Sequence, residues 1–214
     1  MRGGFRYELN GMFAWLLKQI GFDATYLNGR VYREDGSLGI DFDHLTLLVH
    51  APGKSDRWLA DVGFGDSFME PLKFESNGDH VEGQRAYKLE QADGGYVMWQ
   101  RDYDGKWNHQ YFFDLKPRKF PDDYQAGCSY HQNPETSFFG RVSLNSMATA
   151  DGRVTLEDNK LIITKNGQQV EKNGQRKRIF KCLETIFRYH SIKNSDFAGK
   201  AGNQFDESVF PFLC

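Results

Sequence analysis

The stretch Arg2-Gly3-Gly4-Phe5-Arg6-Tyr7-Glu8-Leu9-Asn10 opens a helix, and the rest of the chain is organised around it. Its two glycines permit a sharp turn and a close approach to another group. Apolar residues then recur at helical spacing and Gly21 is placed to end the run, which predicts a helix from Tyr7 to Ile20. The apolar face expected to be buried consists of Leu9, Met12, Phe13, Leu16, Leu17 and Ile20.

The side chain at the start of this helix does not suit its position. A helix that begins after a tight turn presents free backbone N–H groups and the positive end of its dipole. Such a corner favours an anion or a thiolate nucleophile. The residue found there is Arg6, a cation without nucleophilic chemistry.

Composition narrows the class of protein. The chain has 214 residues and a net charge of −2, which argues against strong electrostatic binding to nucleic acid or to an anionic membrane. No apolar run approaches the roughly 20 residues of a membrane span, and the first residues lack the apolar core of a secretory signal. Three widely spaced cysteines do not predict a disulfide framework, and they favour a reducing cytoplasm.

Short β-forming runs separated by glycine turns dominate the first two thirds of the chain. Residues 24–32 predict one strand or a tight hairpin, and residues 43–50 and 57–65 predict an antiparallel pair. Asp93-Gly94-Gly95 and Asp104-Gly105 separate three further strands. The number of strands favours a barrel or sandwich. The three further strands cover 87–89, 96–101 and 107–113.

The remaining residues mix helix and hairpin signals. Pro121 begins a predicted helix that runs to about His131. Residues 152–157 and 160–164 flank Asp158-Asn159 as a hairpin. Residues 175–189 carry apolar side chains at helical spacing, and no structure is predicted after residue 190.

His44 and Asp61 are the candidates for acid–base chemistry. His44 lies at the start of one predicted strand and Asp61 inside the next, so an antiparallel pairing can bring them together. An aspartate bonded to one imidazole nitrogen fixes the tautomer and raises the basicity of the ring. A nucleophile at a helix start would complete a catalytic triad. Spacing alone favours the plainer interpretation, in which both residues are hydrogen-bonded structural groups.

No metal site is predicted. Cys128 and His131 could supply two ligands, but no second Cys/His pair stands at zinc spacing. A buried cysteine on a short helix is the simpler interpretation.

The chain resembles the arylamine N-acetyltransferase family. Three motifs carry the resemblance in the family's order, and further matches extend it to about residue 187. The three motifs are Arg2-Gly3-Gly4-Phe5-x-Tyr7-Glu8-x-Asn10-Gly11, Asp43-His44-Leu45-x-Leu47-Leu48-Val49 and Leu59-Ala60-Asp61-Val62-Gly63-Phe64-Gly65. The further matches are Pro71-Leu72, Phe120-Pro121-x-Asp123-Tyr124 and Gly152-Arg153-Val154-Thr155-Leu156.

The resemblance implies an α+β fold like that of cysteine proteases. It consists of a helical first domain, an antiparallel β-barrel and an α/β lid. On this basis we expect a remnant of the helical domain in residues 1–22, the barrel with His44 and Asp61 in 23–150, and the lid with an irregular tail in 151–214.

The resemblance also implies a reaction and the residues that perform it. In the family, a Cys-His-Asp triad takes the acetyl group of acetyl-CoA as a thioester. It then passes this group to an arylamine, a hydrazine or an N-hydroxyarylamine. His44 and Asp61 match the triad's histidine and aspartate, while Phe5 and Phe64 match aromatic positions that border the acceptor pocket.

Two departures from the family pattern bear on activity. Arg6 stands at the position of the nucleophilic cysteine and cannot form a thioester. Pairing of Arg6 with Asp61 or Glu8 is expected to fill the space. The chain also starts at the first motif, where the family has preceding helices, so we expect a truncated chain. Together these departures predict an impaired or inactive transferase.

Two other functions are kept open. One is a module that binds coenzyme A or an aromatic ligand without turnover. The other is a hydrolase of the cysteine-protease type that uses another nucleophile; no Ser, Thr or Cys stands at position 6 to support it.

Overall fold

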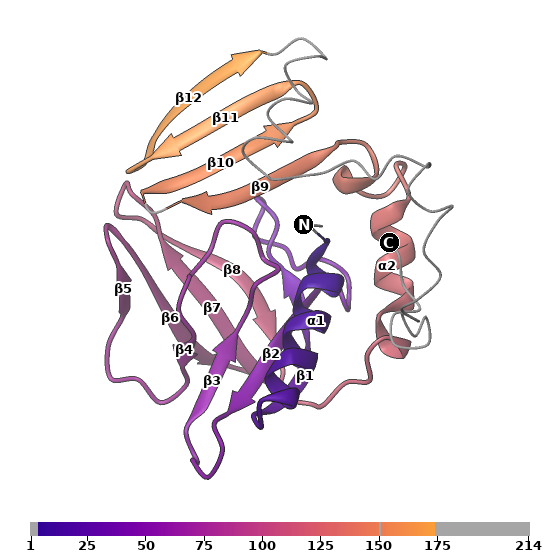
Figure 1. Cartoon of the computed structure of the whole chain (residues 1–214), viewed down its shortest axis with the longest axis vertical. Helices are drawn as coiled ribbons and strands as arrows, with labels where there is room; N and C mark the ends of the chain where they lie inside the picture. The colour runs from indigo at the N-terminus through magenta and orange to yellow at the C-terminus, as the bar shows by residue number, and fades with distance from the viewer. Residues whose placement is uncertain (1–3, 150, 174–214) are drawn as a thin grey trace, which may run out of the picture.

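A computed structural model of the chain describes residues 4–149 and 151–173. A curved eight-stranded antiparallel sheet forms its centre, with strand order β4-β3-β2-β1-β8-β7-β6-β5 (Figure 1). β4 lies against β6 at the open side, so the sheet curls into a nearly closed barrel. The strands are β1 (Asp23–Val31), β2 (His44–His50), β3 (Arg57–Ala60), β4 (Leu72–Lys73), β5 (His80–Glu82), β6 (Arg85–Ala92), β7 (Gly95–Arg101) and β8 (Trp107–Phe113).

A smaller four-stranded antiparallel sheet, ordered β12-β11-β10-β9, lies beyond one end of the barrel (Figure 1). β9 begins before the boundary at residue 150 that we expected between barrel and lid, so the predicted division into domains stays a prediction. The predicted helix at 175–189 and the tail lie outside the described residues. The strands are β9 (Leu144–Thr149), β10 (Gly152–Glu157), β11 (Lys160–Lys165) and β12 (Gln168–Asn173).

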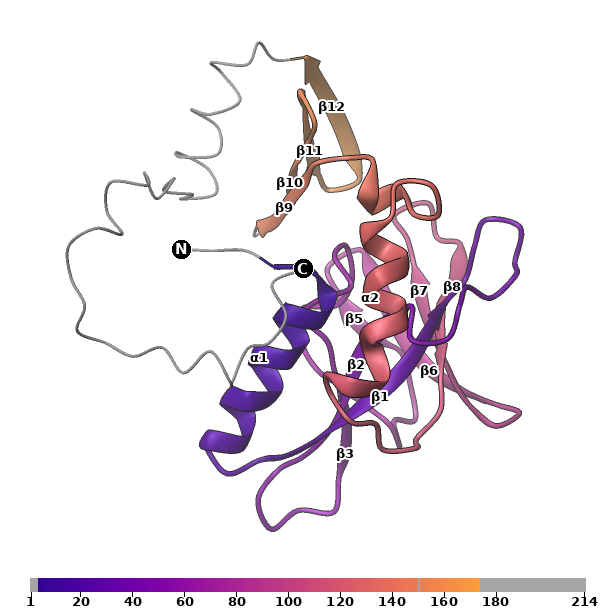
Figure 2. The same cartoon turned by 90° about the vertical axis from the view of Figure 1, so that its right-hand side faces the viewer.

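Two helices, α1 (Arg6–Gln19) and α2 (Gln125–Gln132), stand over one face of the barrel wall (Figure 2). Short 3-10 turns, η1 (Asp122–Tyr124) and η2 (Phe138–Gly140), flank α2. Alternation along β2 builds two cores. Leu45, Leu47 and Val49 face α1, whereas Leu48 faces the barrel interior with Met98, Tyr111 and Phe113. β2 is therefore buried on both faces.

α1 begins and ends one residue earlier than the predicted Tyr7 to Ile20. The Glu8 carboxylate accepts a hydrogen bond from the Phe5 backbone N–H at 2.8 Å and so caps the helix start. A Cβ on Gly4 would lie 2.9 Å from the Glu8 Cβ, so the turn depends on glycine here. Gly21, with a φ of 94°, ends the helix.

The predicted apolar face of α1 is wrong in part. Met12, Leu16 and Ile20 are exposed, while the buried face contains Arg6, Tyr7, Asn10, Gly11, Ala14 and Leu17. The reason is that the face turned to the barrel carries polar groups that bond to β2 and to the turn after β3, and these groups outweigh the apolar periodicity.

Other predicted elements follow the sequence closely. Residues 23–31 form one strand and not a hairpin, and β2 and β3 pair antiparallel as expected. The predicted strand 57–65 is too long, because β3 ends at Ala60. In the described ranges, no helix has both the length and the apolar character needed to cross a membrane.

Candidate functional site

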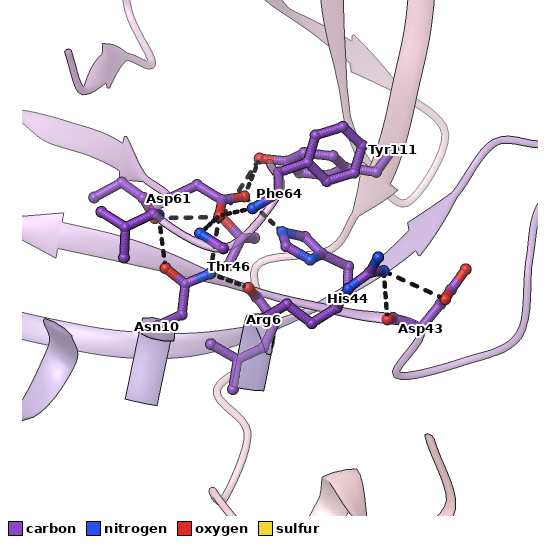
Figure 3. A network of polar contacts seen from close by, with 12 residues as sticks. Arg6, Asn10, Asp43, His44, Thr46, Asp61, Phe64 and Tyr111 are labelled. Carbon is purple, nitrogen blue, oxygen red and sulfur yellow. Dashed lines mark hydrogen bonds and ion pairs between the residues drawn. The ribbon is translucent and has the colours of Figure 1, made fainter. Parts of the chain in front are cut away.

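The fold brings His44 and Asp61 together, as the sequence predicts. His44 begins β2 and Asp61 directly follows β3. The His44 Nε2 atom lies 2.6 Å from the Asp61 Oδ2 atom, and both side chains are fully buried (Figure 3). A buried carboxylate of this kind is stable only when its oxygen atoms accept hydrogen bonds.

Asp61 lies in a turn and not inside a strand, which corrects the prediction. Its Oδ1 atom accepts hydrogen bonds from the backbone N–H groups of Gly63 (2.9 Å) and Phe64 (3.1 Å). An aspartate that bonds the backbone two residues ahead favours a turn over a strand. The bend that ends β3 therefore also orients the carboxylate toward His44.

Two side chains that the sequence did not single out complete the shell of Asp61. Asn10 Nδ2 donates to Oδ1 at 2.8 Å, and the Tyr111 hydroxyl donates to Oδ2 at 3.0 Å. With His44 and the two backbone groups, these give the buried carboxylate five hydrogen-bond partners. Asn10 stands one helical turn after Arg6, so both side chains lie on the same face of α1.

Asn10 also ties three segments to one another. Its Nδ2 donates to the Leu45 carbonyl at 2.6 Å, and its Oδ1 accepts from the Val62 N–H at 2.9 Å. α1, β2 and the turn after β3 thus meet at one fully buried amide.

The hydrogen bonds set the charge states of this cluster. Burial alone would raise the pKa of Asp61, but His44 and the other donors outweigh burial and lower it. Burial and the Asp61 charge raise the pKa of Tyr111 well above its ordinary value. Asp61 is therefore a carboxylate at neutral pH, and Tyr111 is a phenol that donates to it.

Arg6 lies at the start of α1, beside His44 (Figure 3). Its Nη1 donates to the Asp43 carbonyl at 2.9 Å and lies 3.6 Å from the Asp43 carboxylate. The expected pairing with Asp61 or Glu8 is wrong. Asp61 is already saturated by other donors, and Glu8 caps the helix. Burial lowers the pKa of Arg6, and the Asp43 charge opposes that effect.

Two aromatic rings enclose the Arg6 guanidinium. The carbon Cζ lies 4.9 Å from the Phe5 ring centre and 5.0 Å from the Phe139 ring centre. Cation–π contacts of this type stabilise a buried cation. Phe64 packs on the other part of the site, with its ring centre 5.1 Å from that of His44.

One ring nitrogen of His44 has no partner. The Nδ1 atom is buried and makes no hydrogen bond in the described part of the molecule. Figure 3 shows the His44 ring lying beside the Arg6 side chain. Asp61 therefore orients the His44 ring through its Nε2 atom. No described residue exchanges a proton with the Nδ1 atom on the opposite side of the ring.

A second histidine and carboxylate lie next to this site, and sequence reasoning did not connect these two residues. The His131 Nε2 atom lies 2.9 Å from the Asp43 Oδ1 atom, and the His131 Nδ1 atom lies 3.1 Å from the Ser137 hydroxyl oxygen. We call these three residues the Asp43–His131–Ser137 network. No sequence signal marks it, because Asp43 and His131 are 88 positions apart.

The segment that leads into His44 is held from both helices. The Tyr7 hydroxyl of α1 donates to the Phe42 carbonyl at 2.6 Å, and His131 of α2 lies 3.1 Å from the Asp43 carbonyl. Phe42 has a φ of 58°, a conformation that non-glycine residues rarely adopt. Contacts from α1 and α2 therefore fix the corner that positions His44.

The Cys128–His131 segment forms no metal site with its neighbours in the described residues. His131 instead contacts Asp43 and Ser137. Cys128 is buried, and its Sγ atom accepts a hydrogen bond from the Gln132 Nε2 atom at 3.0 Å.

A family model described as N-acetyltransferase matches residues 1–193 of this chain. Arylamine N-acetyltransferase of Mycolicibacterium smegmatis is 27% identical over 202 residues, which span 93% of this chain and 72% of that protein. Human arylamine N-acetyltransferase 1 is 28% identical over 211 residues, which span 87% of this chain and 72% of the human protein.

Solved structures give the same result for the fold. The arylamine N-acetyltransferase structure from M. smegmatis superposes with a TM-score of 0.79 at 26% identity and covers 94% of this chain and 73% of that one. The Mycobacterium marinum enzyme in complex with CoA has a TM-score of 0.78 at 25% identity and covers 93% and 73%. Fold, motif order and family model agree: the chain belongs to the arylamine N-acetyltransferase family.

Proposed function

We propose that this chain keeps the ligand-binding scaffold of an arylamine N-acetyltransferase but does not form the acetyl-thioester, because Arg6 occupies the position of the nucleophile. One observation carries the proposal. The His44 Nε2 atom is fixed by Asp61, while the Nδ1 atom is buried without a partner beside Arg6. This is the nitrogen that would take the proton of a thiol at position 6.

The chemistry of each group supports the assignment. Asp61 is ionised and holds the Nε2–H tautomer of His44, so the Nδ1 lone pair is left free to act as a base. A guanidinium stays protonated under physiological conditions and has no lone pair to attack a thioester carbonyl. His44 is therefore a base with no thiol to deprotonate. The first half of the family reaction, formation of the acetyl-thioester, does not take place.

The proposed ligands follow from the family. A relative's structure contains CoA, and relatives carry the name arylamine N-acetyltransferase. We propose acetyl-CoA as the acetyl donor and an arylamine, hydrazine or N-hydroxyarylamine as the acceptor, with Phe5 and Phe64 bordering the acceptor. A cytoplasmic location stays a prediction.

The test is to restore the thiol. Incubation with acetyl-CoA is expected to give Arg6→Cys an acetyl adduct at that residue by mass spectrometry, and to give the unmodified chain none. With an arylamine acceptor, Arg6→Cys is expected to turn over, and Arg6→Cys combined with His44→Asn is expected to lose about 100-fold or more of that rate.

Thermal unfolding of both variants checks that they fold, since Arg6→Cys leaves Asp43 without its cation. Arylamine acetylation by the unmodified chain at a rate well above that of His44→Ala would overturn the proposal. So would a folded Arg6→Cys variant that forms no adduct.

Binding without turnover is the second candidate. The unmodified site has aromatic rings from Phe5, Phe64 and Phe139 but no nucleophile at position 6. Such a site is suited to bind a ligand without reacting with it. Calorimetry with coenzyme A is expected to show saturable heat for the unmodified chain. No heat at high ligand concentration would rule this candidate out.

A further inference from the structure

The Asp43–His131–Ser137 network has the composition and order of a serine-hydrolase triad. A carboxylate lies 2.9 Å from one nitrogen of the imidazole, and a primary hydroxyl lies 3.1 Å from the other. Serine, histidine and aspartate at these spacings recur on unrelated folds as a device for acyl transfer, and they are recognised by geometry and not by sequence position.

The ring orientation matches that of the first histidine. In both His44 and His131 the Nε2 atom faces a carboxylate, which leaves Nδ1 as the possible base. The difference is that the Nδ1 atom of His44 has no partner, whereas that of His131 meets the Ser137 hydroxyl. Because the Asp43 carboxylate fixes the Nε2–H tautomer, the Nδ1 lone pair of His131 can accept the serine proton.

Ser137 also caps the short turn η2, and this role is compatible with reaction. Its oxygen accepts a hydrogen bond from the Phe139 N–H at 3.3 Å. A hydroxyl has two lone pairs and one proton, so it can accept from a backbone group and donate to His131 at once. Ser137 is 5% exposed and His131 7%, whereas His44 is 0% exposed.

We propose that Ser137 is a nucleophile activated by His131, and that the chain hydrolyses small aromatic esters at this network. The Ser137 oxygen adds to the ester carbonyl while its proton passes to His131. The ester C–O bond then breaks and the leaving phenol takes that proton. Water next attacks the acyl-serine, gives a proton to His131 and releases the acid, after which Ser137 regains its proton.

The surrounding side chains favour an aromatic substrate. The Phe5 and Phe139 rings lie 5.2 and 5.7 Å from the His131 ring, centre to centre. Offset and edge contacts at these distances stabilise aromatic groups. Asp43 does not touch the substrate; it is a positioning residue that holds the His131 tautomer.

The primary test uses the unmodified chain. A fluorophosphonate probe is expected to label one residue, and peptide mass mapping is expected to place the label on Ser137. Hydrolysis of p-nitrophenyl acetate is expected to fall about 100-fold or more in Ser137→Ala and in His131→Asn. Ser129→Ala, an exposed serine on α2, is the matched control and is expected to keep the full rate.

Asp43→Asn is expected to lower kcat and to change the pH profile of kcat, a change that a smaller folded fraction alone would not give. Absence of label on Ser137, or a Ser137→Ala variant that hydrolyses the ester at the unmodified rate, overturns the proposal. Because this test needs neither Cys at position 6 nor coenzyme A, its outcome is separate from that of the proposed acetyltransferase scaffold.

Discussion

Two histidine–carboxylate pairs lie side by side in this molecule, and each has a group that the other lacks. The His44–Asp61 pair has a saturated carboxylate and a fully buried ring, but its free nitrogen meets no nucleophile. The His131–Asp43 pair has a serine on its free nitrogen, but its carboxylate is shared with Arg6. The comparison shows that a fold can orient a histidine base without placing a nucleophile beside it.

The two pairs also differ in how they arise. His44 begins β2 and Asp61 directly follows β3, so the antiparallel pairing of these two strands brings them close together. His131 reaches Asp43 from α2 across a long separation in sequence. The first pair depends on the barrel, and the second depends on how the helices pack against it.

The largest expected effect comes from Asp61→Asn. The variant removes the charge that five donors surround and leaves His44 buried without its partner. Loss of one member of a buried pair costs about 3–5 kcal/mol. We expect chemical denaturation to show a drop of this size in the free energy of unfolding. Asp41→Asn, with a 70% exposed side chain, is the control and is expected to stay within about 0.5 kcal/mol.

The pH dependence of the same variant tests the cause. The folded pKa of Asp61 is lowered from 3.8, so its contribution to stability is fully present above that value and is lost as pH falls through the folded pKa. The stability difference between the unmodified chain and Asp61→Asn is therefore expected to shrink as the pH falls below 3.8. A constant difference would contradict a role for the carboxylate charge.

Gly63→Ala is expected to disturb the His44–Asp61 pair and to lower the melting temperature. A Cβ on Gly63 would lie 2.8 Å from the Arg6 Cα and 2.9 Å from the Arg6 carbonyl oxygen, so α1 must move away from the turn. Overpacking of this kind costs about 1–3 kcal/mol. Gly78→Ala, where no atom lies within 4 Å of the added Cβ, should leave the melting temperature unchanged.

Tyr111→Phe is expected to have the smallest effect. It removes one of five donors to Asp61 and keeps the ring, which costs about 1.5 kcal/mol for a hydrogen bond to a charged group. Denaturant titration measures the change, with Tyr130→Phe on α2 as the control. A loss as large as that of Asp61→Asn would mean that Tyr111, and not the whole shell, holds the carboxylate.

Much of the fold could be predicted from local signals. β-forming runs and glycine turns identify most barrel strands, and Gly21 marks the end of α1. The predicted strand through Asp61 was too long because side-chain bonds from Asp61 to Gly63 and Phe64 compete with strand pairing. The β-propensity of the residues does not take such side-chain hydrogen bonds into account.

The site was predictable only in part. His44 and Asp61 follow from motif order and strand pairing, and the structure brings them together. Asn10 and Tyr111 come from a helix and a distant strand, so no spacing connects them to Asp61. The buried face of α1 was misjudged for the same reason, because Asn10 belongs inside for its hydrogen bonds and not for its hydropathy.

The turn after β3 has no regular secondary structure, but its backbone N–H groups are bonded to buried side chains. Three successive N–H groups, those of Val62, Gly63 and Phe64, end on the side chains of Asn10 and Asp61. Deuterium can replace their protons only when these side-chain bonds open. This turn is therefore expected to exchange with solvent as slowly as the neighbouring strands.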